Sequence, residues 1–256
     1  MNLILIYFAL KYKGDFVSIY NALKNKEIVD PDEIDLLEKR IISGELKVIT
    51  ILDDEYPESL KIIANPPFVL FYEGDISLIN KSALCLTGEK SSDVIVDYLN
   101  QAVEQTSKNN ILTTNYFKGL DELVVNYYLK NKKDVIFVSC NGLKNPYFAN
   151  PIKTESNTLI ISEYPNGVNI NNKRLRERNR ITAAISDALV VFSSQKGSGI
   201  MNLVTNFLNQ GKEIYCYPGL QDENDGNNIL IKDGANLITA ISDITDESIS
   251  KNNNFN

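Results

Sequence analysis

From residue 82 onward, short continuous apolar segments alternate with longer segments whose apolar positions recur every three or four residues. Continuous apolar segments are typical of strands buried on both faces, and the longer spacing is typical of amphipathic helices. The alternation predicts a mostly parallel sheet with helices on both faces, the doubly wound class of α/β proteins. The expected strands are 83–87, 111–114, 134–139, 158–162, 188–193, 213–217 and 236–238, and the expected helices are 93–107, 120–131, 175–186 and 199–210.

The residues before this region follow a less regular pattern. In residues 1–45, short apolar runs alternate with charged residues, and Pro31 and Gly44 mark the start and end of one helix. Acidic residues early in that helix and basic residues late in it support the prediction. The expected elements are a helix at 31–43, with Gly44 beyond its end, a strand at 48–52, a helical turn or two at 56–63 and a strand at 68–72.

These patterns divide the chain into four parts. We expect one main α/β core, because 256 residues suffice for one good core and a small appendage. The last residues, SISKNNNFN, are polar and are typical of a frayed end. The parts are a short helical N-terminal preface at 1–45, a lead-in segment packing on the core at 46–81, the core at 82–245 and a polar tail at 246–256.

The composition narrows the functions that this core can have. The chain has no histidine, the side chain that most general acid–base mechanisms and most transition-metal sites use. We therefore expect no catalytic residues and no metal. The net charge of -7 disfavours nucleic-acid binding by the surface as a whole, so a polyanion site needs a local concentration of positive charge.

The sequence also bears on the compartment. It has no run of about 18 apolar residues, and the opening segment MNLILIYFALKYKGD is too short and has its charges on the wrong side for a signal peptide. Cys85, Cys140 and Cys216 lie far apart in apolar strand-like runs, which favours buried thiols in a reducing compartment. We expect a cytoplasmic protein with no membrane partner.

A local concentration of positive charge does occur in one segment. The chain has 31 asparagines and 21 lysines but five arginines, and four of those arginines fall within seven residues. A composition biased towards lysine that keeps guanidinium groups in one place indicates that planar, bidentate donors matter there. The four are Arg174, Arg176, Arg178 and Arg180.

These arginines follow a strand, in a loop that runs into a helix. At helical spacing Arg174 lies beside Arg178, and Arg176 lies beside Arg180, which predicts two basic rows facing a phosphate backbone. The alternative is a solvated basic helix start. The partial positive charge of a helix N-terminus makes cations there unfavourable unless an anion compensates them, so we favour anion binding.

Two other loops have the composition of phosphate-binding turns. SQKGSG places Lys196, Ser198 and Gly199 at a helix N-terminus after a strand, although such a turn is equally common as a tight connection. A later loop contains Gly226 and Asn228, and by itself it is explained as structural. The turn after the first core strand, TGEKSSD, lacks the Gly-x-Gly-x-x-Gly fingerprint, so we expect no NAD or FAD.

Tyrosines are the most numerous aromatic residues of the chain, at 13. Four of them lie at or near the ends of expected elements, where a nucleobase could stack. A partly or fully buried position in the core is the commoner situation for tyrosine, and we favour it. The four are Tyr56, Tyr116, Tyr164 and Tyr217.

Taken in order, several segments resemble the DprA/Smf family of DNA-processing proteins. DDEYPESLKIIANPPFVLFYEGD resembles the family's Tyr-Pro-x-x-Leu and Pro-Pro-x-x-Leu stretch. ISEYP and RERNRITAAISDALVV resemble its Ser-Glu-Tyr-Pro and Arg-Asn-Arg-Ile segments, and YCYPG and GNNILIKDGANLI resemble its last two motifs. The resemblance covers residues 46 to about 240, and its motifs together are far more specific than any one of them.

The resemblance implies a Rossmann-like core that binds single-stranded DNA in a basic pocket, forms a homodimer and promotes loading of a RecA-type recombinase during natural transformation. It implies no catalytic residue and no cofactor. It places Arg178, Asn179 and Arg180 in the DNA pocket. It also places Ser198 and Gly199 in a neighbouring turn, and Gly226 and Asn228 as residues that shape the site.

The chain departs from the family in the first half of the core. The family has Gly-Ser-Arg after the first strand, whereas this chain has TGEK, so that Lys90 is the one candidate to replace the arginine. The small residues and histidine of the next turn are replaced by the bulkier TNYFKGLDELVVN, where Gly119 and Asp121 remain. We expect reduced DNA affinity or a changed binding mode, and no winged-helix domain of the kind that some members carry.

We therefore predict a DNA-binding protein that uses Arg174, Arg176, Arg178, Arg180, Lys196 and Lys90 for phosphate contacts, with weak sequence preference. One alternative is a nucleotide-processing enzyme of phosphoribohydrolase type, which needs a glutamate in a Gly-Gly-x-Gly-Thr-x-x-Glu turn that SQKGSGIMN lacks. Another is an interaction scaffold that has lost DNA binding and still associates with the recombinase.

Overall fold

The structure is a computed structural model that describes residues 2–89, 91–219 and 225–244. One nine-stranded sheet, in the order β1-β2-β6-β5-β4-β3-β7-β8-β9, forms the centre of the molecule. β3 to β9 are parallel to one another, and β1 and β2 join antiparallel at the β6 edge. The strands are β1 (Val48–Thr50), β2 (Val69–Gly74), β3 (Ala83–Thr87), β4 (Ile111–Thr114), β5 (Val135–Ser139), β6 (Thr158–Ser162), β7 (Ala188–Val191), β8 (Glu213–Cys216) and β9 (Asn236–Leu237).

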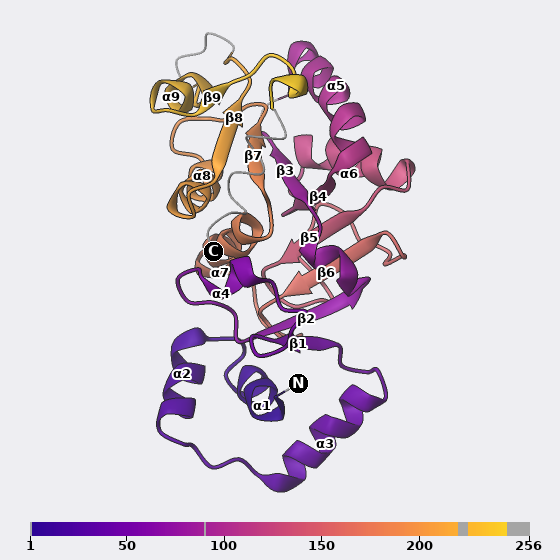
Figure 1. Cartoon of the computed structure of the whole chain (residues 1–256), viewed down its shortest axis with the longest axis vertical. Helices are drawn as coiled ribbons and strands as arrows, with labels where there is room; N and C mark the ends of the chain where they lie inside the picture. The colour runs from indigo at the N-terminus through magenta and orange to yellow at the C-terminus, as the bar shows by residue number, and fades with distance from the viewer. Residues whose placement is uncertain (1, 90, 220–224, 245–256) are drawn as a thin grey trace.

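Helices cover both faces of the parallel strands (Figure 1). Side chains alternate between the two faces along a strand. In β3, Leu84 and Leu86 pack against α5 and α6, whereas Cys85 between them packs against α7 and α8. These helices are α5 (Asp93–Asn109), α6 (Leu120–Lys130), α7 (Asn172–Ala184) and α8 (Gly199–Asn209), followed by the short α9 (Asn227–Lys232). The predicted Rossmann-like, doubly wound sheet is confirmed.

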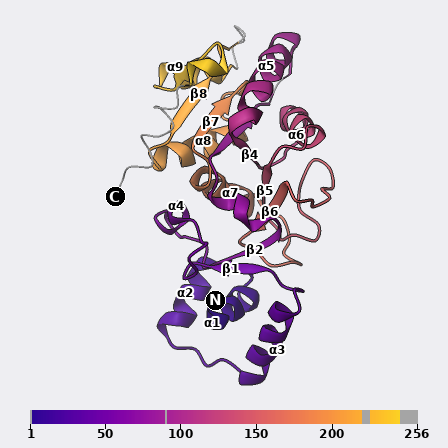
Figure 2. The same ribbon diagram turned by 45° about the vertical axis from the view of Figure 1, so that its right-hand side comes forward.

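Residues 2–45 are mostly helical and lie together below β1 and β2 (Figures 1 and 2). The sequence pattern predicted one helix here, and the structure has three: α1 (Leu3–Lys11), α2 (Phe16–Lys24) and α3 (Pro31–Ile42). The α1 sequence, LILIYFALK, is almost entirely apolar and shows little amphipathic periodicity. It packs, with α2 and α3, against Val48, Val69 and Phe71 of the first two strands.

The lead-in segment belongs to the sheet itself. β2 pairs antiparallel with β6, with Phe71 opposite Ser162, so the lead-in extends the sheet beyond the parallel strands. A 3₁₀ helix (Ile76–Asn80) connects β2 to the core, and the short α4 (Glu58–Lys61) lies in the connection between β1 and β2. The buried Tyr56 hydroxyl fixes this connection by donating a hydrogen bond to the carbonyl oxygen of Pro67 at 2.6 Å.

Candidate nucleic-acid interface

The predicted site residues cluster at one edge of the sheet because of the strand order. β3 and β7 are neighbours, yet the chain leaves β3 towards α5 on one face and leaves β7 towards α8 on the other. Such a switch point opens a crevice at the carboxyl ends of the strands, where open α/β sheets bind ligands. The loops after β3, β4, β5 and β7 converge there, together with α7.

Helix α7 begins earlier than the sequence predicted, at Asn172, and therefore contains all four clustered arginines. The side chain of Asn171 caps it by accepting a hydrogen bond from the backbone N–H of Arg174 at 2.9 Å. An asparagine at this position satisfies an amide that the first helical turn leaves free. This cap extends the helix across the start of the basic segment.

Arg178 lies buried in α7, with 1% of its surface exposed. None of its three guanidinium nitrogens has a hydrogen-bond partner among the described residues. Burial lowers its pKa to about 10, which leaves the group charged at neutral pH. Its guanidinium carbon lies 4.9 Å from the centre of the Phe117 ring. A buried charge without hydrogen bonds is costly unless a ligand or a partner compensates it.

A buried carboxyl group that acts on Arg178 is that of Asp121, at the start of α6. Its carboxylate accepts hydrogen bonds from the Thr87 hydroxyl at 2.9 Å and from the Phe117 amide at 3.1 Å. Burial raises the pKa of Asp121 to about 6, although these hydrogen bonds and the charge of Arg178 lower it. Asp121 thus offsets part of the charge of Arg178 and makes no ion pair with it within 4.0 Å among the described residues.

Asn179 belongs to a buried chain of polar side chains. Its Oδ1 accepts a hydrogen bond from Asn115 at 3.0 Å, and its Nδ2 donates to Asn202 at 2.9 Å. Asn115 also accepts a hydrogen bond from Thr182 at 2.7 Å. These bonds tie the end of β4 and helix α8 to α7, so Asn179 fixes the position of the helix that carries Arg178. Sequence reasoning did not find Asn115 or Asn202, which lie far from Asn179 along the chain.

Arg180 is committed to an ion pair. Its guanidinium forms a two-pronged pair with the carboxylate of Glu163, with one N–O distance of 2.8 Å, and donates to the carbonyl oxygen of Asn65. The Arg180 side chain is 14% exposed and that of Glu163 is 5% exposed. Burial acts to lower the pKa of Arg180, but the adjacent Glu163 outweighs it and the pKa is raised.

The two exposed basic rows that helical spacing predicted are not what the structure shows. Arg178 ends one row and Arg180 ends the other, and both point into the protein. Arg174 is partly exposed, and its guanidinium carbon lies 5.2 Å from the centre of the Tyr164 ring. Its guanidinium donates a hydrogen bond to the carbonyl oxygen of Asn169. Arg176 is exposed. The physical reason is the direction in which each side chain leaves α7. Arg178 is directed into the protein, Arg180 towards Glu163 and Arg176 towards solvent.

The turn between β7 and α8 carries the predicted Lys196, Ser198 and Gly199. Lys196 and Gly199 are exposed, and the buried Oγ of Ser198 has no hydrogen-bond partner within the described part of the chain. The amide of Gln195 in the same turn donates to the Glu89 carboxylate at 2.8 Å. One amide of this turn is therefore already hydrogen-bonded to a carboxylate of the protein. That carboxylate, of Glu89, belongs to the segment that stands where the family has Gly-Ser-Arg.

The last predicted loop holds the end of β7 in place. A Cβ atom on Gly226 would lie 2.5 Å from the Ser194 hydroxyl, so the close approach requires glycine. Asn228 is exposed and accepts a hydrogen bond from the Gly219 amide at 3.1 Å. The neighbouring Asn227 is fully buried and bonds Ser194, Val191 and Tyr217, a role that the sequence did not reveal. The predicted Lys90 lies outside the described residues.

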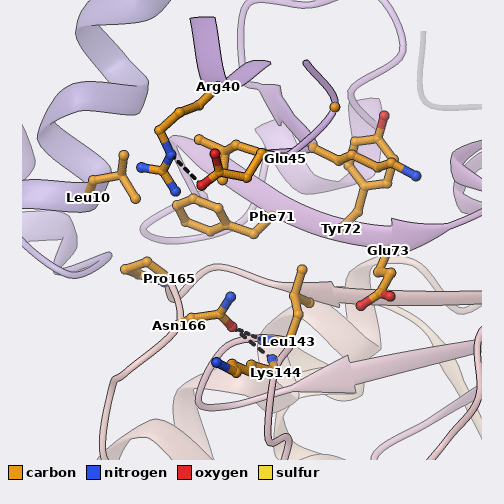
Figure 3. A pocket seen from close by; sticks show the side chains of 13 residues that line it. Leu10, Arg40, Glu45, Phe71, Tyr72, Glu73, Leu143, Lys144, Pro165 and Asn166 are labelled. Atoms are coloured by element: carbon orange, nitrogen blue, oxygen red, sulfur yellow. Dashed lines mark hydrogen bonds and ion pairs between the residues drawn. The ribbon is translucent and has the colours of Figure 1, made fainter. Parts of the chain in front are cut away.

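A separate cavity of about 640 Å³ lies between the N-terminal helices and the sheet. Figure 3 shows Arg40 and Glu45 facing each other on one side of it, and Asn166 on the other side bonded to the amides of Leu143 and Lys144. Its charged side chains have both signs, and Arg40 is paired with Glu45. None of the predicted site residues that the structure describes lines this cavity, which is therefore distinct from the Arg178 site.

The described part of the chain offers neither a metal site nor a membrane-spanning helix. Within residues 2–89, 91–219 and 225–244, no group of three or more histidine, cysteine, aspartate or glutamate side chains is arranged to hold a metal ion. None of the described helices combines the length and the apolar character needed to cross a membrane. The three cysteines are buried free thiols.

Comparison with known proteins supports the resemblance found in the sequence. The DNA processing protein DprA of Bacillus subtilis is 27% identical over 218 residues, which cover 81% of this chain and 73% of that protein. DprA of Streptococcus pneumoniae is 27% identical over 205 residues, covering 77% and 73%. Protein Smf of Escherichia coli is 24% identical over 193 residues, covering 72% and 52%.

Solved structures share the fold. The crystal structure of Streptococcus pneumoniae DprA matches with a TM-score of 0.70 at 22% identity, covering 94% of this chain and 92% of that one. DNA processing protein A of Helicobacter pylori, whose structure concerns its single-stranded DNA binding mode, matches with a TM-score of 0.67 at 22% identity over 78% and 94%. The sequence model of the family described as DNA recombination-mediator protein A matches residues 47–248. Since this match spans most of the chain, the protein belongs to the DNA recombination-mediator protein A family, the DprA/Smf family of DNA-processing proteins.

Proposed function

We propose that this protein binds single-stranded DNA at the switch-point crevice, with a backbone phosphate compensating the charge of Arg178. The observation that carries the proposal is the buried Arg178 guanidinium with no hydrogen-bond partner among the described residues. Guanidinium groups bind phosphate oxygens with strong, charge-assisted hydrogen bonds. The single-stranded DNA binding of the Helicobacter pylori protein supports the same ligand class for this chain.

The other predicted residues take different roles around Arg178. Arg174, Arg176 and Lys196 reach the surface and suit contacts with the phosphates that flank the buried one. Ser198 and Gly199 stand at the N-terminus of α8, where an additional phosphate oxygen is favoured. The elements that carry these groups are held in position by Asn179, Arg180, Gly226 and Asn228. Phosphate contacts of this kind carry little sequence preference.

We extend this proposal to the family's biology. The protein acts in the cytoplasm as a homodimer without catalysis or cofactor, and it hands the bound strand to a RecA-type recombinase during DNA uptake or recombination. Sedimentation equilibrium tests the dimer. The recombinase step is tested by the ATPase rate of a RecA-type recombinase on a strand pre-coated with single-strand-binding protein. The proposal requires that this protein shortens the lag, and an unchanged lag contradicts it.

DNA binding itself is tested by fluorescence anisotropy of a labelled oligothymidine of about 20 nucleotides across a salt series. We expect log K to fall with log salt by about 0.7 per contacted phosphate. The double variant Arg176→Gln/Lys196→Gln should bind more weakly and with a shallower slope. The matched control is Lys24→Gln/Lys39→Gln, which makes the same charge change on the N-terminal helices. Equal slopes for the two double variants would contradict the placement of the site.

A further inference from the structure

Two exposed aromatic side chains lie beside Arg178. Phe117, in the loop after β4, is 41% exposed, and Tyr147, in the loop after β5, is 48% exposed. Their ring centres are 6.5 Å apart in an edge-to-face arrangement. Arg178 lies behind Phe117, with its guanidinium carbon 4.9 Å from the ring centre. We call Phe117 and Tyr147 the aromatic platform; it combines two loops at the carboxyl edge of the sheet with the arginine of α7.

The backbone before Phe117 is built to present this ring. Tyr116 has a φ of 52°, in the left-handed region that non-glycine residues seldom adopt. Its own ring is buried against Phe137 and Phe148, and its hydroxyl accepts a hydrogen bond from Asn150. The Phe117 amide is fixed in turn by Asp121. Burial of one ring in a left-handed conformation thus leaves the next ring at the surface, against Arg178.

The loop that carries Tyr147 is also ordered by specific hydrogen bonds. The Tyr147 amide donates to Oδ1 of Asn141 at 2.9 Å, and Nδ2 of Asn141 donates to the carbonyl oxygen of Asn145 at 2.7 Å. A single side chain therefore closes this loop and sets the place of Tyr147. An exposed aromatic residue alone needs no explanation, but two on separate ordered loops beside an unpartnered buried cation do.

We propose that the aromatic platform stacks a nucleobase of the single strand whose phosphate is held at Arg178; this rests on the function proposed above. Proteins that bind single strands without sequence preference combine cationic grooves with aromatic rings on which bases stack. One ring face of Phe117 is turned to Arg178, and a cation behind a ring draws electron density from it, which suits stacking on an electron-rich base. Because the two ring planes are inclined by 74°, the base stacks on the exposed part of the Phe117 ring and lies beside Tyr147.

The aromatic platform includes a residue at which this chain departs from the family pattern. The bulky segment at Tyr116 and Phe117 stands where the family has small residues. Of the tyrosines that could have stacked a base by their position in the sequence, Tyr56, Tyr116, Tyr164 and Tyr217 are all buried, as expected for core residues. Base stacking therefore falls to Phe117 and Tyr147 among the aromatic residues around Arg178 that the structure describes.

The absence of tryptophan from the chain allows a direct test. Phe117→Trp introduces a single tryptophan, whose fluorescence a stacked base quenches. The variant is titrated with oligothymidine and with an abasic oligomer of the same length and charge, while anisotropy reports binding of each. The control is Tyr20→Trp, an exposed aromatic position on α2 that is 50% exposed and lies among the N-terminal helices.

We expect oligothymidine to quench the tryptophan of Phe117→Trp by at least half. The abasic oligomer should leave it unchanged, and neither oligomer should affect Tyr20→Trp. Binding by anisotropy without quenching would overturn the platform and leave DNA binding intact. Failure of the wild-type protein to bind either oligomer would overturn the function proposed above, and the platform with it.

A second variant separates stacking from a structural role. Wild-type protein should prefer oligothymidine over the abasic oligomer by roughly tenfold, the order expected for one stacked base. Phe117→Leu should lose most of this preference and keep the affinity for the abasic oligomer and its salt slope. Equal loss of affinity for both oligomers would show that Phe117 only supports the fold, and would overturn the proposal.

Discussion

Arg178 and Arg180 lie two residues apart on one helix, and both side chains are largely buried, yet their surroundings differ in kind. Arg180 meets a carboxylate, Glu163, and a backbone carbonyl, so that its charge is compensated inside the protein. Arg178 meets the face of Phe117 and has no hydrogen-bond partner among the described residues. A run of arginines after a strand thus holds one buried charge that a carboxylate compensates and one without hydrogen bonds among the described residues, and burial alone does not tell the two apart.

The largest expected effect comes from breaking the pair that Arg180 makes. Removing one partner of a buried ion pair leaves an uncompensated charge and costs about 3–5 kcal/mol. Arg180→Met should therefore lower the free energy of unfolding in urea by that order. Glu163→Gln should have an effect of the same sign. A loss below about 1 kcal/mol for both variants would show that this pair is not structural.

A smaller effect should follow from titrating Asp121. Its pKa of about 6 in the folded protein lies above the value near 3.9 of an unfolded chain. The ionised carboxylate therefore destabilises the fold above pH 6, and this penalty disappears as the pH falls through 6. We expect the stability to rise by about 1–2 kcal/mol between pH 7 and pH 5. DNA affinity should rise too, since a neutral Asp121 leaves the charge of Arg178 uncompensated.

This pH dependence can be assigned to one group because the chain has no histidine. Asp121→Asn keeps the size of the side chain and removes the ionisation. Urea unfolding and anisotropy at pH 5, 6 and 7 should then give nearly constant stability and affinity for the variant. A dependence on pH that persists unchanged in Asp121→Asn would refute the assignment.

Removing the charge of Arg178 should affect stability in the opposite direction to removing that of Arg180. Replacement of a buried charged group by an apolar side chain of similar volume is often neutral or stabilising. Arg178→Met should therefore leave the free energy of unfolding unchanged or raise it by about 1 kcal/mol. A loss of several kcal/mol in urea unfolding would mean that Arg178 stabilises the fold as Arg180 does.

The smallest effect is expected at an exposed arginine. Arg40 pairs with Glu45 at 2.8 Å, and their side chains are 38% and 62% exposed. Surface pairs of this kind contribute about 0.2–1 kcal/mol. Arg40→Met should change the free energy of unfolding by no more than that, which makes it the reference for both buried arginines. A loss as large as that of Arg180→Met would show that arginine removal is damaging regardless of its surroundings.

The sequence predicted those elements whose signal is local. Buried parallel strands are continuous apolar runs, so β3 to β8 were found within a few residues of their bounds. Helix α1 was missed because it is apolar almost throughout. The antiparallel joining of β2 to β6 was missed because strands so far apart in the chain show no shared pattern.

The sequence predicted where the candidate site lies, but it did not predict which groups its arginines contact. The arginine cluster and the turn at Lys196 do lie at the carboxyl edge of the sheet. Which arginine is compensated depends on Glu163, at the end of β6, and on Asp121 and Phe117, which follow β4. Only the fold brings these residues to α7, so spacing along the helix suggested two equivalent rows instead of one ion pair and one unpaired charge.

The most direct test of this account measures binding of oligothymidine to Arg178→Met by anisotropy, on protein whose unfolding transition matches that of the wild type. The account predicts a loss of affinity of tenfold or more and a shallower dependence on salt, with stability retained. Wild-type affinity and salt dependence in Arg178→Met would contradict it, because the buried, unpaired guanidinium would then have no part in holding the strand.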